Sequence, residues 1–156
     1  MENRYTKQAR EALDAAEVYA KELKHPYIGT EHLLMGLRTS ISGVAAQVLE
    51  MNGLREEDVR KVVGELVSRV GDEPFSGRPK ESPRLKFILE EGRKMAERFR
   101  MSEVGTEHLL LAIVRDTDCV AARILITLNI NLQKIFQDIM NAVGADPKEY
   151  QEENQE

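Results

Sequence analysis

The chain has 156 residues, of which 42% are hydrophobic, 31% are charged and 5% are aromatic. These proportions are typical of a globular domain and exclude a fibrous chain or one that is disordered throughout. Leu, Ala, Glu, Lys, Arg and Met are abundant and favour helices, so the composition predicts an all-α fold. The single cysteine, Cys119, excludes an internal disulfide and is typical of a reducing compartment.

The formal net charge of −5 is concentrated at the carboxyl end of the chain. Residues 145–156 hold five acidic side chains against one lysine, so the rest of the chain is nearly balanced. Nucleic-acid-binding proteins usually present a basic face to the phosphates, so we expect no nucleic acid partner. The chain has no apolar run of membrane-spanning length and no secretion signal, so we expect no membrane association and a cytoplasmic location.

An internal repeat organises the sequence. Gly-Thr-Glu-His-Leu-Leu occurs at residues 29–34 and again at residues 105–110, an offset of 76 residues. The same offset, without a gap, aligns Val-Ala-Ala at residues 44–46 with Val-Ala-Ala at residues 120–122. Because core and loop positions also match, the sequence predicts two tandem four-helix repeats related by a pseudo-twofold, with eight helices and no β-sheet.

The helices of the first repeat are predicted from apolar positions at helical spacing: one over about residues 6–23, one that opens at Thr30, and two over about residues 43–51 and 55–69. Thr6 and its partner Ser82 are natural N-caps for the first helix of each repeat. Thr30 and its partner Thr106 are predicted to cap the second helix in the same way, each after a glycine.

The repeat also predicts the organisation of the chain. We expect the first repeat at residues 1–70, a linker at 71–81, the second repeat at 82–144 and an acidic, disordered tail at 145–156. The linker is rich in Pro and Gly, which favour turns. We expect the two repeats to form one domain.

The doubled motif, the Thr or Ser at the first cap and Gly-Val-Ala-Ala at residues 43–46 give the chain a family resemblance. Over about residues 4–143 it resembles the N-terminal domain of Clp-type AAA+ unfoldases, the ClpC branch most closely. The resemblance implies an eight-helix fold that receives substrate proteins and adaptor proteins for a hexameric ATPase, which feeds a ClpP-type protease. Residues 100–103 lack the His-plus-aromatic character of residues 24–27, so the two repeats are not expected to offer identical surfaces.

The same resemblance implies a ligand, phosphoarginine, which is a degradation mark on substrate proteins. Glu31 and Glu107 would hold its guanidinium side. The hydroxyl and free N–H groups at the helix starts of Thr6 and Ser82 would hold its phosphate, as helix N-termini do for anions. The alternative is that both glutamates are only first-turn charges, which stabilise a helix by about 0.3–1 kcal/mol.

The pairs Glu31-His32 and Glu107-His108 also allow a metal site. Adjacent helical residues point about 100° apart, so such a pair does not converge on one ion as i, i+4 pairs do. We therefore expect no metal, and histidines that pack at the helix start and bond to nearby backbone. Cys119 lies at a helix start, which can lower a thiol pKa, but we interpret it as a small helix-start residue rather than a nucleophile.

No Gly-x4-Gly-Lys-Ser/Thr sequence occurs, so the chain has no P-loop, and we expect neither catalysis nor a cofactor. We expect a monomer, and the resemblance implies a substrate- and adaptor-binding domain. If the parent protein is an AAA+ ATPase, we expect its ATPase modules beyond Glu156. Two alternatives remain: a stand-alone Clp N-domain-like protein that modulates the protease complex, and a small metal-binding protein that uses the Glu-His pairs.

Overall fold

Eight helices carry nearly all the regular structure in the computed structural model, which describes residues 4–70 and 76–144. They are α1 (Lys7–Glu22), α2 (Thr30–Thr39), α3 (Val44–Met51), α4 (Glu56–Val70), α5 (Pro83–Arg98), α6 (Thr106–Arg115), α7 (Val120–Thr127) and α8 (Leu132–Val143). The all-α fold is therefore confirmed. The predicted tail at 145–156 and the first five residues of the predicted linker lie outside the described residues.

The helices of the two repeats are in the same register. At the offset of 76 residues, α5, α6 and α7 begin and end where α1, α2 and α3 do, and α8 begins where α4 does. Positive φ angles recur at matching positions too, with 59° at both Lys24 and Arg100, 87° at Gly53 and 62° at Asn129. This agreement is consistent with a pseudo-twofold relation between the repeats.

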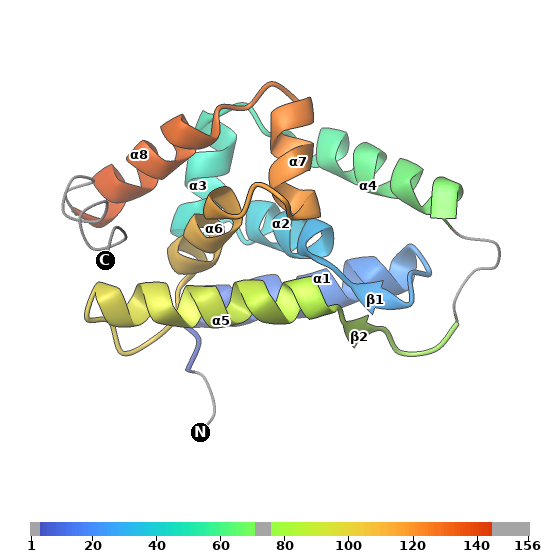
Figure 1. Cartoon of the computed structure of the whole chain (residues 1–156), viewed down its shortest axis with the longest axis horizontal. Helices are drawn as coiled ribbons and strands as arrows, with labels where there is room; N and C mark the ends of the chain where they lie inside the picture. Colours follow the sequence, from blue (N-terminus) through green and yellow to red (C-terminus); the bar gives the residue numbers. More distant parts are fainter. Residues whose placement is uncertain (1–3, 71–75, 145–156) are drawn as a thin grey trace.

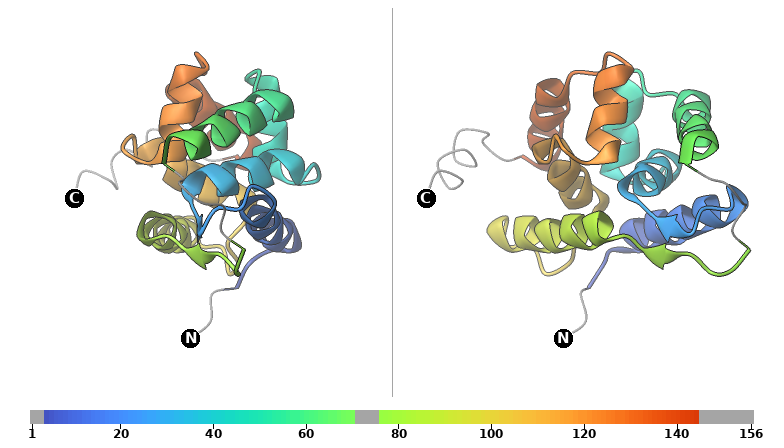
Figure 2. Two further views of the ribbon diagram at one scale, coloured as in Figure 1. Left: turned by 90° about the vertical axis from the view of Figure 1, so that its right-hand side faces the viewer. Right: turned by 45° about the vertical axis from the view of Figure 1, so that its right-hand side comes forward.

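The helices form three levels around one apolar core (Figure 1). Helices α1 and α5 lie on one side of the molecule, and α2 and α6 pack above them beneath the other four (Figures 1 and 2). Every one of the eight helices contributes side chains to the core, and α2 and α6 are buried along most of their length. No helix in the described part of the chain is long and apolar enough to cross a membrane.

The prediction that the chain contains no β-sheet is wrong in one detail. A short strand, β1 (Tyr27–Ile28), pairs in parallel with β2 (Lys80–Glu81), which is the end of the predicted linker. A single parallel bridge joins Tyr5 to Val104. Strands of two residues have no alternating pattern that would reveal them in the sequence.

These two pairings are equivalent contacts, because they join residues that correspond at the offset of 76 residues. The N–H of Ser82 donates to the carbonyl of Ile28 at 3.0 Å, and the N–H of Thr6 donates to the carbonyl of Val104 at 2.9 Å. In both cases the segment before the first helix of one repeat pairs with the segment before the second helix of the other. The pairing therefore joins the repeats to each other.

The two motif threonines, Thr30 and Thr106, also make their hydrogen bonds to the other repeat. The prediction that they cap their own helices is therefore wrong. Each is the first residue of its helix, and the preceding glycine is the N-cap. The hydroxyl of Thr30 instead accepts the N–H of Ala121 in α7 at 3.0 Å, and that of Thr106 accepts the N–H of Ala45 in α3 at 3.2 Å. Both threonines are almost fully buried, so each repeat supplies a cap inside the other.

Two buried histidines anchor the start of α2. His32 Nδ1 accepts the N–H of Gly29 at 2.8 Å, and His32 Nε2 lies 2.7 Å from His25 Nδ1. Because His32 Nδ1 is an acceptor, the proton of a neutral His32 is on Nε2 and is donated to His25. Burial lowers the pKa of His25, and burial together with His25 lowers the pKa of His32 to about 3. Both rings are therefore neutral at pH 7.

The second repeat keeps only half of this arrangement. His108 Nδ1 accepts the N–H of Gly105 at 2.8 Å, as in the first repeat. At the position of His25, however, stands Met101, and the ring of Phe99 stacks on His108 with centroids 6.1 Å apart. The predicted bond from each motif histidine to nearby backbone is thus confirmed in both repeats.

Replacing Thr30 with Val keeps the shape of the side chain and removes the hydroxyl. The N–H of Ala121 would then be buried without its acceptor, so we expect Thr30→Val to lower the free energy of unfolding by about 1–3 kcal/mol. Urea unfolding followed by circular dichroism measures this difference. The control is Thr127→Val, at an exposed position of α7, which should change stability by less than about 0.5 kcal/mol. Equal stabilities of the two variants would show that the crossed cap contributes nothing.

The histidine pair predicts a loss of stability in acid. An unfolded histidine titrates near its ordinary pKa of about 6.5, whereas His25 and His32 stay neutral in the folded state to lower pH. As the pH falls through about 6.5, the unfolded state binds more protons than the folded state. The free energy of unfolding, which is at its full value above this pH, therefore decreases as the pH falls. Replacing His25 with Met, the residue of the second repeat, should remove up to about 1 kcal/mol of the loss between about pH 7 and 5.5. Urea unfolding at the two pH values measures it, and an equally steep loss in His25→Met would contradict the explanation.

Candidate functional site

The first two predicted site residues, Thr6 and Ser82, are the N-caps of α1 and α5. The Thr6 hydroxyl accepts the N–H of Ala9 at 3.1 Å, and the Ser82 hydroxyl accepts the N–H of Leu85 at 3.0 Å. Both side chains are partly buried. Each hydroxyl therefore satisfies one first-turn N–H, and the other donors of that turn remain available to an anion.

The number of remaining donors differs between the two helix starts. An α-helix leaves its first N–H groups without partners inside the helix, which at α1 are those of Lys7 and Gln8. At α5 the first position is Pro83, which has no N–H, so Arg84 supplies the one comparable donor. The start of α1 is therefore the richer donor site.

Within one repeat, the glutamate and the cap are too far apart to share a small ligand. Thr6 lies at the start of α1, whereas Glu31 follows the short connection from its far end. A helix of 16 residues is about 24 Å long. The predicted site residues of a single repeat are thus not brought together.

Across the repeats, a glutamate and a cap do come close along the backbone. The bond from Ser82 to Ile28 places the start of α5 beside the segment that leads, three residues later, to Glu31 (Figure 1). The equivalent bond from Thr6 to the segment before α6 brings the start of α1 to the side of Glu107. Helix α2 contacts α5, and α1 contacts α6. The geometry therefore pairs each glutamate with the helix start of the other repeat.

The carboxylates of Glu31 and Glu107 fold back over the glycine before each helix. A Cβ atom added to Gly29 would lie 2.1 Å from Glu31 Oε1, and one added to Gly105 would lie 2.3 Å from Glu107 Oε1. Burial raises the pKa of Glu31, and a hydrogen bond from its own N–H offsets part of that rise. Both carboxylates thus lie at the positive end of a helix dipole, where they stabilise the helix and can also accept a cationic donor.

The Glu-His pairs do not assemble into a metal site in the described residues. No group of three or more His, Cys, Asp or Glu side chains lies together there. In addition, the Nδ1 atoms of His32 and His108 already accept backbone N–H groups. The imidazoles therefore serve the helix starts rather than a common ion.

Cys119 is the N-cap of α7, as a helix-start residue should be. Its sulfur accepts the N–H of Ala122 at 3.4 Å, and the side chain is 1% exposed. Burial raises the pKa of the thiol, so the possible lowering at a helix start is overridden. The thiol is therefore protonated and buried, which is the opposite of a nucleophile's environment.

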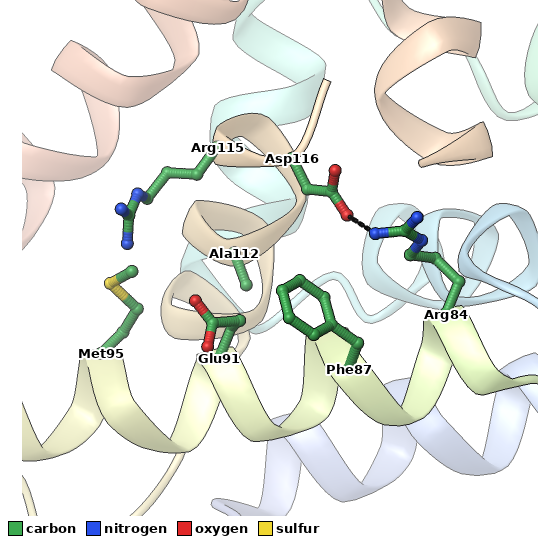
Figure 3. Close-up of a pocket in the computed structure, with 7 residues that line it drawn as sticks. All are labelled: Arg84, Phe87, Glu91, Met95, Ala112, Arg115 and Asp116. Carbon is green, nitrogen blue, oxygen red and sulfur yellow. Dashed lines mark hydrogen bonds and ion pairs between the residues drawn. The ribbon is translucent and has the colours of Figure 1, made fainter. Parts of the chain in front are cut away.

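A hollow of about 170 Å³, which no sequence motif predicted, lies between α5 and α6 (Figure 3). It is lined by Arg84, Phe87, Glu91, Met95, Ala112, Arg115 and Asp116. Arg84 closes one end with an ion pair to Asp116 at 2.9 Å, and its guanidinium lies 5.6 Å from the centre of the half-exposed Phe87 ring.

At the offset of 76 residues, the first repeat packs differently at the place of this hollow. In the first repeat Gly36 of α2 lies so close to α1 that an added Cβ would be 2.1 Å from the carbonyl oxygen of Ala12. The corresponding residues of α6 and α5 are Ala112 and Ile88, whose larger side chains do not allow so close an approach. The pair of small residues in one repeat and its loss in the other was the signal available in the sequence.

Comparison with known proteins agrees with this architecture. Residues 4–128 match the Clp repeat (R) N-terminal domain family. Over 145 residues the chain is 38% identical to the negative regulator of genetic competence ClpC/MecB of Bacillus subtilis strain 168, covering 93% of this chain and 18% of that protein. It is 37% identical over 145 residues to the ATP-dependent Clp protease ATP-binding subunit ClpC of Staphylococcus aureus strain USA300, covering 90% and 17%. The chain thus spans less than a fifth of the length of these relatives.

Solved structures show the same fold at lower identity. The N-terminal domain of the chaperone ClpD from Arabidopsis thaliana has a TM-score of 0.74 at 19% identity, covering 90% of this chain and 97% of that one. The ClpV N-domain in complex with a VipB peptide has a TM-score of 0.67 at 23% identity, covering 88% of both chains. The matched residues, the identity to the ClpC proteins and the shared fold lead to one conclusion: the chain belongs to the Clp repeat N-terminal domain family.

Proposed function

We propose that this chain is the N-terminal domain of a ClpC-type ATPase subunit, which receives substrate and adaptor proteins and binds phosphoarginine at two sites. The observation that carries the proposal is the crossed arrangement of the site residues. In both repeats the backbone segment that leads to the glutamate is hydrogen-bonded to the capped helix start of the other repeat, and the carboxylate folds back over that segment. Such a pair offers an acceptor for a guanidinium and donors for a phosphate in one place.

The chemistry of phosphoarginine matches this pair. Its N–H groups need an anionic acceptor, and its phosphate needs several N–H donors that carry a partial positive charge. Glu31, whose burial strengthens its interaction with a cation, supplies the acceptor beside the start of α5. Free arginine lacks the phosphate, and inorganic phosphate lacks the guanidinium, so each would use only half of the site.

The relatives support the wider role. The Staphylococcus aureus relative is an ATP-binding subunit of a Clp protease, and the ClpV N-domain was solved with a peptide bound to it. A domain of this fold can therefore bind a peptide, and presentation of protein segments to an attached ATPase is part of our proposal for this chain. In this chain, the adaptor and substrate partners and the coupling to a ClpP-type protease are part of our proposal.

The two sites are expected to differ in strength. Glu107 is paired with the start of α1, where Lys7 and Gln8 both offer N–H groups, whereas Glu31 is paired with the start of α5, where Pro83 offers none. We expect the site of Glu107 to hold the phosphate more tightly.

Glu31→Gln and Glu107→Gln test whether the carboxylates bind ligand or only support their helices. Glutamine keeps the size of the side chain and removes the charge that a guanidinium needs. Each substitution should weaken its own site by about 1.5–3 kcal/mol, which is ten- to a hundredfold in affinity for phosphoarginine. Stability should fall by less than about 1 kcal/mol. Isothermal titration calorimetry with phosphoarginine, arginine and phosphate measures the affinities.

The control for these variants is Glu50→Gln, which removes an exposed carboxylate from α3. Its affinity for phosphoarginine should equal that of the wild type. If the Glu31→Gln, Glu107→Gln double variant also binds phosphoarginine like the wild type, the glutamates are helix-dipole charges only and the proposed ligand site is wrong.

A further inference from the structure

Gly29 and Gly105 are N-cap residues that have no side chain to accept a first-turn N–H. In four other helices the side chain of the N-cap residue accepts a first-turn N–H, and these residues are Thr6, Ser82, Cys119 and Asn131. In α3 the N-cap residue is also a glycine, Gly43. Neither Gly29 nor Gly105 makes such a bond, although Ser, Asp or Asn would stabilise a helix more at that place. The same omission in both repeats requires a reason.

The backbone does not supply that reason. Gly29 has φ −103° and ψ 179°, and Gly105 has φ −98° and ψ 173°. Both are extended conformations, which any residue adopts without strain. An alanine could therefore follow the same backbone path at either position.

The space that the glutamate side chains need explains why glycine occupies these two positions. The three atoms nearest to a Cβ on Gly29 all belong to the Glu31 carboxyl group, at 2.1, 2.7 and 2.9 Å. At Gly105 the three nearest atoms belong to Glu107, at 2.3, 2.8 and 3.0 Å. Contacts this short are repulsive, so with any side chain at these positions the carboxylate would have to leave.

We infer that Gly29 and Gly105 are positioning residues, which hold the carboxylates of Glu31 and Glu107 against the helix start by leaving the space that these carboxylates fill. The ligand part of this inference rests on the proposed function. A Cβ at residue 29 would turn Glu31 outward into solvent and would leave the helix itself in place. The glycine thus acts on a ligand only through the glutamate.

The test uses Gly29→Ala, with Gly64→Ala as the matched control, because a Cβ on Gly64 in α4 would meet nothing within 4 Å. The first measurement is the titration of the Glu31 carboxyl group by carbon-13 NMR. In the wild type, burial raises the pKa of Glu31, so Gly29→Ala should lower it toward the ordinary value for glutamate. Gly64→Ala should leave it unchanged. This measurement needs no ligand.

The second measurement is the affinity for phosphoarginine by calorimetry. Gly29→Ala should weaken the site of Glu31 about tenfold or more, approaching the loss in Glu31→Gln. The double variant Gly29→Ala, Glu31→Gln should bind no more weakly than Glu31→Gln alone, because two changes that act through one group are not additive. The corresponding variants at Gly105 and Glu107 repeat the test at the second site.

Two results would overturn the inference: a Glu31 titration in Gly29→Ala that is the same as in the wild type, or additive losses of affinity in the double variant. A wild type that does not bind phosphoarginine would refute the proposed function instead. In that case the titration alone still decides whether the glycine positions the carboxylate.

Discussion

Crossed hydrogen bonds between the two repeats are the constraint on which the rest of this structure depends. Thr30 caps a helix of the second repeat, Thr106 caps a helix of the first, and the short strand pairings cross in the same sense. The two threonine bonds are buried, where an unsatisfied N–H is costly. Neither repeat is therefore complete alone, and both candidate sites, which lie where the repeats cross, depend on the same contacts.

The sequence predicted the features that are local. The offset of 76 residues located all eight helices, because apolar spacing and caps such as Thr6 and Ser82 act within a few residues. It could not predict what Thr30 bonds to, since the acceptor and donor are 91 residues apart and a threonine at a helix start suits either helix. The strand pairings were missed for the same reason, as two extended residues carry no pattern of their own.

The candidate site, too, was predictable from the sequence only in part. The sequence identified the glutamates and helix starts one by one, with the help of a family resemblance, but it could not say which belong together. The backbone bonds at Ser82 and Thr6 supply that information. Divergence between the repeats then differentiates the surroundings: His25 is replaced by Met101, and close packing at Gly36 is replaced by a hollow beside Ala112. Two sites of one design can therefore differ in affinity and in acid sensitivity.

The central claim is that each site joins a glutamate from one repeat to a helix start from the other. Amide NMR spectra recorded during a titration with phosphoarginine test it most directly, in the wild type and in Glu31→Gln. Our account predicts that Glu31→Gln strongly reduces, at the same phosphoarginine concentration, the shifts of the amides of Ser82, Arg84 and Leu85 at the start of α5. The shifts of the amides at the start of α1, residues 6–9, should be preserved. Loss of the shifts at the start of α1, with those at α5 intact, would contradict it.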